Sequence, residues 1–143
     1  MYIKLLNDQA KIPTRGSSCA AGYDLYAAIT EPVTIYPGTN VPVGTGIAME
    51  IPDGFFGAIF ARSGLATKRG LRPANAVGVV DSDYRGEVIV PLHNDSNEAQ
   101  QVLPGERIAQ MVIAKYEKIE WEEVEQLGET ERGTGGFGST GVK

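Results

Sequence analysis

Short apolar runs separated by turn sequences follow one another along most of the chain. They are rich in Val, Ile and Tyr, which fit the pleated, half-buried surface of a β-strand. Steps such as Tyr36-Pro37-Gly38 and Leu103-Pro104-Gly105 stand between them and predict tight turns. One segment, Ser63–Lys68, is predicted to be helical with Ser63 as its N-cap. The predicted strands are Tyr2–Leu6, Tyr23–Ala28, Val33–Ile35, Thr39–Val43, Gly46–Glu50, Gly57–Ala61, Val77–Val80, Glu87–Leu92, Gln101–Leu103, Ile108–Lys115 and Glu120–Val124.

This succession of short strands is typical of an antiparallel sandwich, barrel or jelly roll, so the predicted fold class is all-β. No internal repeat or linker divides the chain. From about Gly128 the apolar pattern stops. We therefore expect a β core of residues 1–127, followed by a mobile, Gly-rich C-terminal arm of residues 128–143.

Length and charge narrow the function classes. A chain of 143 residues with 42% apolar residues is expected to form one domain with a sizeable core. Its net charge of −5 argues against a broad nucleic-acid footprint, because phosphate backbones require clustered Lys and Arg. No apolar stretch has the length of a membrane span, and the first run reaches Asn7-Asp8 too soon for a secretory leader. We expect a soluble, intracellular protein that binds neither nucleic acid nor membrane.

The chain has one cysteine, Cys19, and one histidine, His93. An internal disulfide, a Cys-rich zinc site and a metal site built on several histidines are thereby excluded within one chain. A Ser-His-Asp triad would have to use His93, which is predicted instead to be a surface residue at a strand end. Carboxylates, arginines, hydroxyls and an added metal ion remain as the available chemistry.

The segment from Arg132 to Gly141 combines repeated glycines with hydroxyls, a guanidinium and one aromatic ring, Phe137. Free backbone N–H groups, hydroxyls and an arginine suit a polyphosphate, and a lone aromatic ring can stack on a base. Composition alone favours a flexible tail. The rest of the chain decides between the two interpretations.

Other segments carry candidate chemistry, and each has a plain structural alternative. Asp24 sits in an apolar strand, as a site residue or in a salt bridge. Arg62-Ser63-Gly64 opens the predicted helix, as an anion site or an ordinary cap. Asp81 and Asp83 would share one face of an extended segment, where a carboxylate can deprotonate water, or lie in a polar turn. Gln110 interrupts a buried-looking strand, as a site residue or a satisfied core amide.

In this order and together with the tail, these segments resemble the five motifs of the trimeric dUTP pyrophosphatases (dUTPases). The resemblance runs from about Ile12 to the C-terminus. One departure is Ala61, which stands where many relatives carry proline before Arg-Ser-Gly and affects loop stiffness more than chemistry. The segments that match especially well are Arg62-Ser63-Gly64-Leu65-Ala66, Asp81-Ser82-Asp83-Tyr84-Arg85-Gly86 and the tail Arg132-Gly133-Thr134-Gly135-Gly136-Phe137-Gly138-Ser139-Thr140-Gly141.

The resemblance implies a jelly roll or distorted β-barrel that assembles as a homotrimer. Each active site would be built from three subunits, one of which lends its C-terminal arm. The implied reaction is hydrolysis of dUTP to dUMP and pyrophosphate with Mg²⁺, in the cytoplasm. Such an enzyme keeps uracil out of DNA and supplies dUMP for thymidylate synthesis.

The resemblance also assigns roles. Asp81 matches the general base, Gln110 the amide near the α-phosphate, and Asn75 the side chain that contacts the base and orients the water. Asp24 matches the carboxylate that holds Mg²⁺ through water. The matched substrate contacts are Arg62, Ser63, Gly64, Arg132, Gly138, Ser139 and Thr140 for the phosphates, a β-hairpin of Asn75, Ala76, Val77 and Gly78 for uracil, Tyr84 under deoxyribose, and Phe137 stacked over uracil.

Three alternatives remain open at this point. A dCTP deaminase shares the implied fold but needs a catalytic Glu at the cytosine ring. A non-catalytic nucleotide-sensing trimer would keep the binding residues and not need Asp81. A lectin-like β-sandwich explains the strands but not the Gly-rich arm.

Overall fold

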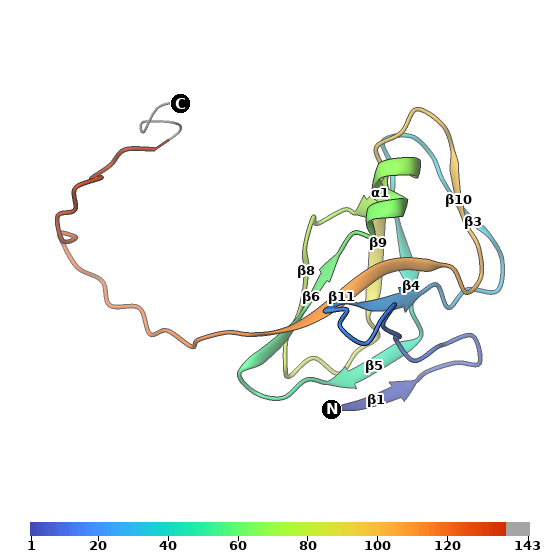
Figure 1. Ribbon diagram of the computed structural model, residues 1–143, viewed down its shortest axis with the longest axis horizontal. Helices are drawn as coiled ribbons and strands as arrows, with labels where there is room; N and C mark the ends of the chain where they lie inside the picture. The colour runs from blue at the N-terminus through green and yellow to red at the C-terminus, as the bar shows by residue number, and fades with distance from the viewer. Residues whose placement is uncertain (137–143) are drawn as a thin grey trace.

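The computed structural model describes residues 1–136, which fold into short strands and a single short helix (Figure 1). The predicted all-β class is therefore confirmed. No helix in this range is long and apolar enough to cross a bilayer. The elements are β1 (Tyr2–Leu5), β2 (Tyr23–Tyr26), β3 (Val33–Ile35), β4 (Asn40–Gly44), β5 (Ile47–Glu50), β6 (Phe55–Phe60), α1 (Ser63–Arg69), β7 (Leu71–Pro73), β8 (Gly78–Val80), β9 (Ile89–Asn94), β10 (Gln100–Val102) and β11 (Arg107–Lys115).

The strands form small antiparallel sheets in a jelly-roll-like arrangement and do not close into a continuous barrel. The orders of the sheets in the described range are β2-β11-β6-β8, β4-β9-β7, β1-β5 and β10-β3. Strand β11 is the longest and lies between β2 and β6, so it brings Tyr23–Tyr26 and Phe55–Phe60 into one sheet. This sheet positions most of the candidate site.

The two faces of this sheet have different roles. On β11, Ala109 and Met111 are buried in the core, whereas Gln110 and Val112 are only partly buried. Because successive side chains of a strand point to opposite faces, the second pair lies on the outer face. Met111 lies opposite Ile59 of β6, which also belongs to the core. The outer face is therefore free to carry polar chemistry.

Two strand predictions fail for identifiable reasons. Leu71–Pro73 forms β7 although it was not predicted, because a three-residue run ending in proline is a weak strand signal. Glu120–Val124 was predicted as a strand but is irregular and exposed, and Trp121 is 90% exposed. Its alternating pattern finds no strand to pair with among the described residues of the same chain.

After β11 the chain leaves the body as a long irregular tail (Figure 1). Two contacts attach the first residues of this tail to the β5–β6 turn. The Tyr116 N–H donates to the Gly54 carbonyl at 3.0 Å, and Lys118 Nζ forms an ion pair with Asp53 Oδ1 at 2.7 Å. The hydrogen bond of this ion pair lowers the pKa of Asp53 and raises the pKa of Lys118. Residues 119–134 are exposed.

Candidate active site

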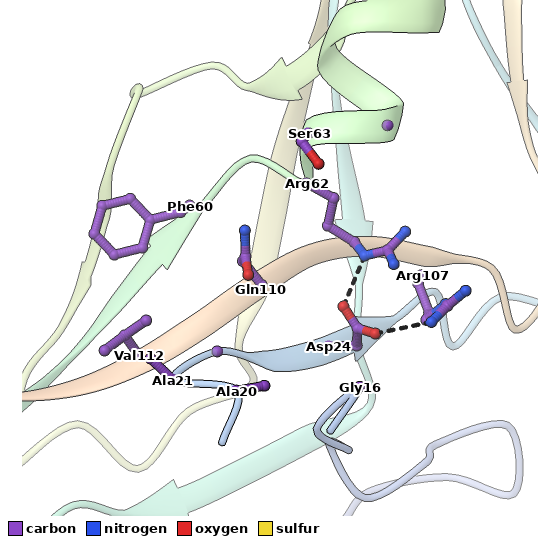
Figure 2. Close-up of a pocket in the computed structure, with 12 residues that line it drawn as sticks. Gly16, Ala20, Ala21, Asp24, Phe60, Arg62, Ser63, Arg107, Gln110 and Val112 are labelled. Atoms are coloured by element: carbon purple, nitrogen blue, oxygen red, sulfur yellow. Dashed lines mark hydrogen bonds and ion pairs between the residues drawn. The ribbon is translucent and has the colours of Figure 1, made fainter. Parts of the chain in front are cut away.

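A cavity of about 630 Å³ opens on the outer face of the four-stranded sheet, beside the start of α1 (Figure 2). We call it the arginine pocket. It brings together five of the residues singled out in the sequence, from β2, the β6–α1 junction and β11. Its lining consists of Gly16, Ala20, Ala21, Gly22, Asp24, Phe60, Arg62, Ser63, Gly64, Arg107, Gln110 and Val112.

Asp24 is held between two arginines. Its Oδ1 accepts a hydrogen bond from Arg62 Nε at 2.7 Å, and its Oδ2 accepts one from Arg107 Nη1 at 3.1 Å (Figure 2). The Asp24 side chain is 13% exposed, whereas the Arg107 side chain is 50% exposed. The salt-bridge interpretation of Asp24 is thus observed. Two guanidiniums against one carboxylate leave the arginine pocket with an excess positive charge that suits an anion.

Arg107 is a pocket residue that the sequence did not reveal. It lies three positions from Gln110, so a regular strand would place the two side chains on opposite faces. The pairing of β11 with β2 shifts register between Arg107 and Ala109. An extra residue of this kind re-aims a side chain. The irregularity therefore lets Arg107 and Gln110 line the same pocket.

The prediction that Ser63 caps the helix is wrong. Ser63 is the first residue of α1, and Arg62 is the N-cap residue, in an extended conformation and without a side-chain cap bond. The Ser63 hydroxyl is consequently not a capping group and lines the arginine pocket. A Cβ placed on Gly64 would meet nothing within 4 Å, so the chain is open to a ligand at this point.

Gln110 is partly buried at the pocket rather than enclosed in the core. Its Nε2 donates to the Ala61 carbonyl at 2.9 Å, which ties β11 to the junction that carries Arg62. A Cβ on Gly22 would lie 2.5 Å from the Gln110 Oε1. A side chain at position 22 would therefore push this amide out of its present position.

A second cavity, of about 220 Å³, lies beside β8 and the turn that follows it. We call it the turn pocket. It collects four residues singled out in the sequence: Asn75, Gly78, Asp81 and Tyr84. Its full lining consists of Ile59, Asn75, Gly78, Val79, Val80, Asp81, Tyr84, Glu87, Val88 and Ile89.

Asp81 begins a β-turn, because the Tyr84 N–H donates to the Asp81 carbonyl at 3.2 Å. The expectation that Asp81 and Asp83 share one face of an extended segment is therefore wrong. Asp81 is exposed and lines the turn pocket, whereas Asp83 does not belong to its lining.

The segment Asn75–Gly78 is a turn between two sheets, not a β-hairpin. The strand before it, β7, pairs with β9, and the strand after it, β8, pairs with β6. At its tip, Val77 N–H donates to the Asn75 carbonyl at 2.6 Å across Ala76, which has φ of 60°. Ala76 is the one non-glycine residue with positive φ in the described range. Such strain persists only where the surroundings enforce it, often at functional sites.

Within one chain the two pockets are separate. They share no lining residue. Phe60 lines the arginine pocket, and its neighbour on β6, Ile59, lines the turn pocket, so these two side chains point to opposite faces of the sheet. A small ligand in one pocket of this chain is therefore not in contact with the other.

The remaining sequence candidates lie elsewhere. Arg132 is exposed on the tail, and its Nε donates to the Gly135 carbonyl at 2.8 Å. Ala76 and Val77 are exposed at the tip of the 75–78 turn.

His93 lines neither pocket and contacts Asn40 and Asp95. Four further candidates, Phe137, Gly138, Ser139 and Thr140, lie outside the described residues.

Comparison with known proteins gives one consistent result. A family model described as dUTPase matches residues 8–141. A deoxyuridine 5'-triphosphate nucleotidohydrolase of Rickettsia felis is 50% identical over 97% of this chain and 94% of the relative. The dUTPase of Staphylococcus bacteriophage 80alpha, solved with dUPNHPP, has a TM-score of 0.90 at 30% identity, over 99% of this chain and 98% of that one. A dUTPase mutant from phage phi11 of S. aureus, solved with a structural Mg(II) ion, has a TM-score of 0.78 at 26% identity, over 87% and 96%.

Proposed function

Because this chain belongs to the dUTPase family and is a dUTP diphosphatase, we propose that it hydrolyses dUTP by in-line attack of water at the α-phosphorus. The products are dUMP and pyrophosphate. The observation that carries this mechanism is the division of chemistry between the two pockets. Cationic groups gather in the arginine pocket, and an exposed carboxylate, Asp81, lies in the turn pocket.

Asp81 is the proposed general base. A carboxylate in hydrogen-bond reach of a water can accept its proton as the oxygen attacks phosphorus. Asp81 suits this role because the turn at its carbonyl fixes its backbone while its side chain is exposed in the pocket. Asn75, in the same pocket, is proposed to contact the base and to orient the water, and Gln110 to lie near the α-phosphate.

The arginine pocket is the proposed triphosphate site. Arg62, Ser63 and Gly64 would contact the phosphates, and Arg107 adds a second guanidinium beside them. Charge-assisted hydrogen bonds from these groups neutralise the leaving pyrophosphate. These contacts therefore stabilise the negative charge that develops on the pyrophosphate as it leaves.

We propose that Mg²⁺ enters this site together with the substrate. No cluster of three or more His, Cys, Asp or Glu side chains exists among residues 1–136. Asp24 is a single carboxylate that already accepts two arginine hydrogen bonds. Mg²⁺ commonly keeps several waters and binds through substrate phosphates and one or two carboxylates. Asp24 would accordingly hold a hydrated, dUTP-bound Mg²⁺ through water, and the ion would offset phosphate charge.

The turn pocket is the proposed site for the nucleoside. Backbone groups of Asn75, Ala76, Val77 and Gly78 would pair with uracil. Cytosine would present a donor where uracil presents an acceptor, which leaves buried groups unpaired. Tyr84 would pack under the deoxyribose and collide with a ribose 2′-hydroxyl.

Since the pockets are separate in one chain, we infer that the complete site forms between subunits of a homotrimer. One subunit would supply the arginine pocket and another the turn pocket. The arm, residues 128–143, would come from a third, since a dozen extended residues span about 40 Å. Arg132, Gly138, Ser139 and Thr140 would then contact the phosphates, and Phe137 would stack over uracil.

The proposed reaction is tested by separating the products after incubation with Mg²⁺ and each deoxynucleoside triphosphate in turn. We expect dUMP and pyrophosphate from dUTP alone. Release of ammonia from dCTP would indicate a deaminase instead. Binding of dUTP without any product would indicate a nucleotide sensor.

The substitution Arg107→Met tests whether Arg107, which was not predicted from the sequence, contacts the triphosphate. Loss of one charge-assisted contact, about 1.5–3 kcal/mol, should raise KM for dUTP by about one to two orders of magnitude. Steady-state kinetics measure the change. Lys115→Met is the matched control, because it removes a cation from the other end of the same strand, where the side chain is 70% exposed. Equal effects of both substitutions would contradict a specific role for Arg107.

A further inference from the structure

The ring of Tyr84 lies across Gly86. A Cβ built on Gly86 would stand 2.4 Å from the Tyr84 hydroxyl oxygen, 2.6 Å from Cζ and 3.0 Å from Cε2. The first two distances are shorter than real Cβ contacts and the third is at their lower limit, so the ring fills the space of the missing side chain. Gly86 does not have positive φ. An alanine would therefore disturb the ring and not the backbone.

Hydrogen bonds fix Tyr84 at both ends. Its N–H donates to the Asp81 carbonyl at 3.2 Å, and its hydroxyl donates to the Glu87 carbonyl at 3.0 Å. The side chain is nonetheless 46% exposed in the turn pocket. An exposed tyrosine side chain ordinarily samples several rotamers. Here the two hydrogen bonds and the contact with the Gly86 backbone hold the ring in one orientation.

The acceptor of the Tyr84 hydroxyl is itself anchored. The Glu87 carboxylate accepts the Gly46 N–H at 2.8 Å. A Cβ on Gly44 would lie 2.6 Å from the same carboxylate oxygen, so a side chain there would displace the carboxylate from its present position. The next residue, Val88, is 2% exposed in the core. The orientation of the Tyr84 ring therefore depends on Glu87, which is anchored to the β4–β5 turn on one side and followed by the core residue Val88.

We propose that Gly86 is a positioning residue that sets the selectivity for deoxyribose over ribose, by fixing the ring plane of Tyr84. The inference rests on the proposed function, in which Tyr84 packs under the sugar. A ring with a fixed plane excludes a 2′-hydroxyl by direct collision. A ring displaced from Gly86 can tilt and leave space for that oxygen, so the discrimination falls.

The experiment compares kcat/KM for dUTP and for UTP in the wild type and in Gly86→Ala. We expect the dUTP:UTP ratio to fall about tenfold or more in the variant. The fall should arise mainly from a lower KM for UTP, while kcat for dUTP changes less than the ratio does. A glycine with a purely structural role would lower both substrates' kcat/KM together and leave the ratio unchanged.

A pair of Glu87 variants provides an independent measurement should Gly86→Ala fail to fold. Glu87→Gln keeps a side-chain oxygen that can accept the Gly46 N–H, whereas Glu87→Ala removes it. We expect Glu87→Gln to retain most of the wild-type selectivity and Glu87→Ala to lose it. Equal ratios in the two variants would overturn the anchoring argument.

The outcomes separate this inference from the proposed function. A wild type that does not hydrolyse dUTP overturns the proposed function. A wild type that is active and selective, with a Gly86→Ala variant that folds and stays equally selective, overturns the role of Gly86 alone.

Discussion

Replacing Asp81 with asparagine is expected to lower kcat for dUTP by about 10²–10⁴-fold while dUTP still binds, because general-base catalysis contributes a factor of this size. Asparagine has nearly the same shape as aspartate but cannot accept the proton of the attacking water. The measurements are steady-state hydrolysis and calorimetric titration with dUTP and Mg²⁺. A variant that kept most of its activity would show that another group is the base. Asp83→Asn is the matched control, since Asp83 lies two residues away and outside the turn pocket.

Mixing two inactive variants tests whether the general base and the phosphate site that it serves come from the same subunit or from different subunits. Asp81→Asn affects the turn pocket, and Arg62→Gln affects the arginine pocket. If the site forms between subunits, mixed trimers contain some sites in which both pockets are intact. Activity should then return when the two inactive proteins are refolded together. Failure to regain activity in verified mixed trimers would place both pockets' contributions in a single subunit.

Removal of residues 131–143 is expected to lower kcat by about two orders of magnitude or more and to leave the proposed trimer folded. Closure of a segment over a site excludes water and completes the contacts to the reacting group. Arg132 lies in the removed segment and is exposed in the isolated chain, where its Nε contacts only the tail's own Gly135 carbonyl among described residues. The hydrophobic core does not depend on this segment, since the last buried residue of the core is Met111.

The truncated protein is examined by light scattering and thermal unfolding beside its kinetics. A mass equal to three truncated subunits and an unchanged melting temperature, together with low kcat, would support a lid. Near-normal turnover would exclude one. Arg132→Gln in the full-length chain is the finer variant, and it should reproduce part of the loss without any change in chain length.

The sequence predicted the elements whose signals are local. Val33–Ile35, which lies between Pro32 and the Tyr36-Pro37-Gly38 turn, was predicted as a strand and matches β3. Asp24 and Gln110 were singled out because each interrupts an apolar strand, and both line the arginine pocket. The order of the candidate segments led to the family, and the family model matches residues 8–141.

The parts that were missed depend on contacts between distant segments. A register shift between two strands carries no local signal, and it is this shift that places Arg107 in the arginine pocket. The cap of α1 falls on Arg62 rather than Ser63 because Arg62 still has extended backbone and Ser63 is already helical, a one-residue boundary that the sequence pattern does not resolve. The segment 75–78 connects two sheets because β9, which comes later in the chain, pairs with β7.

The exposed indole of Trp121 gives the protein an intrinsic optical reporter. It is the single tryptophan of the chain and lies on the tail between β11 and residue 128. Indole emission shifts to shorter wavelength when the ring leaves water, so covering this stretch by another subunit would change the colour of the emitted light. Dilution series and nucleotide titrations can therefore follow assembly of the unlabelled enzyme in real time.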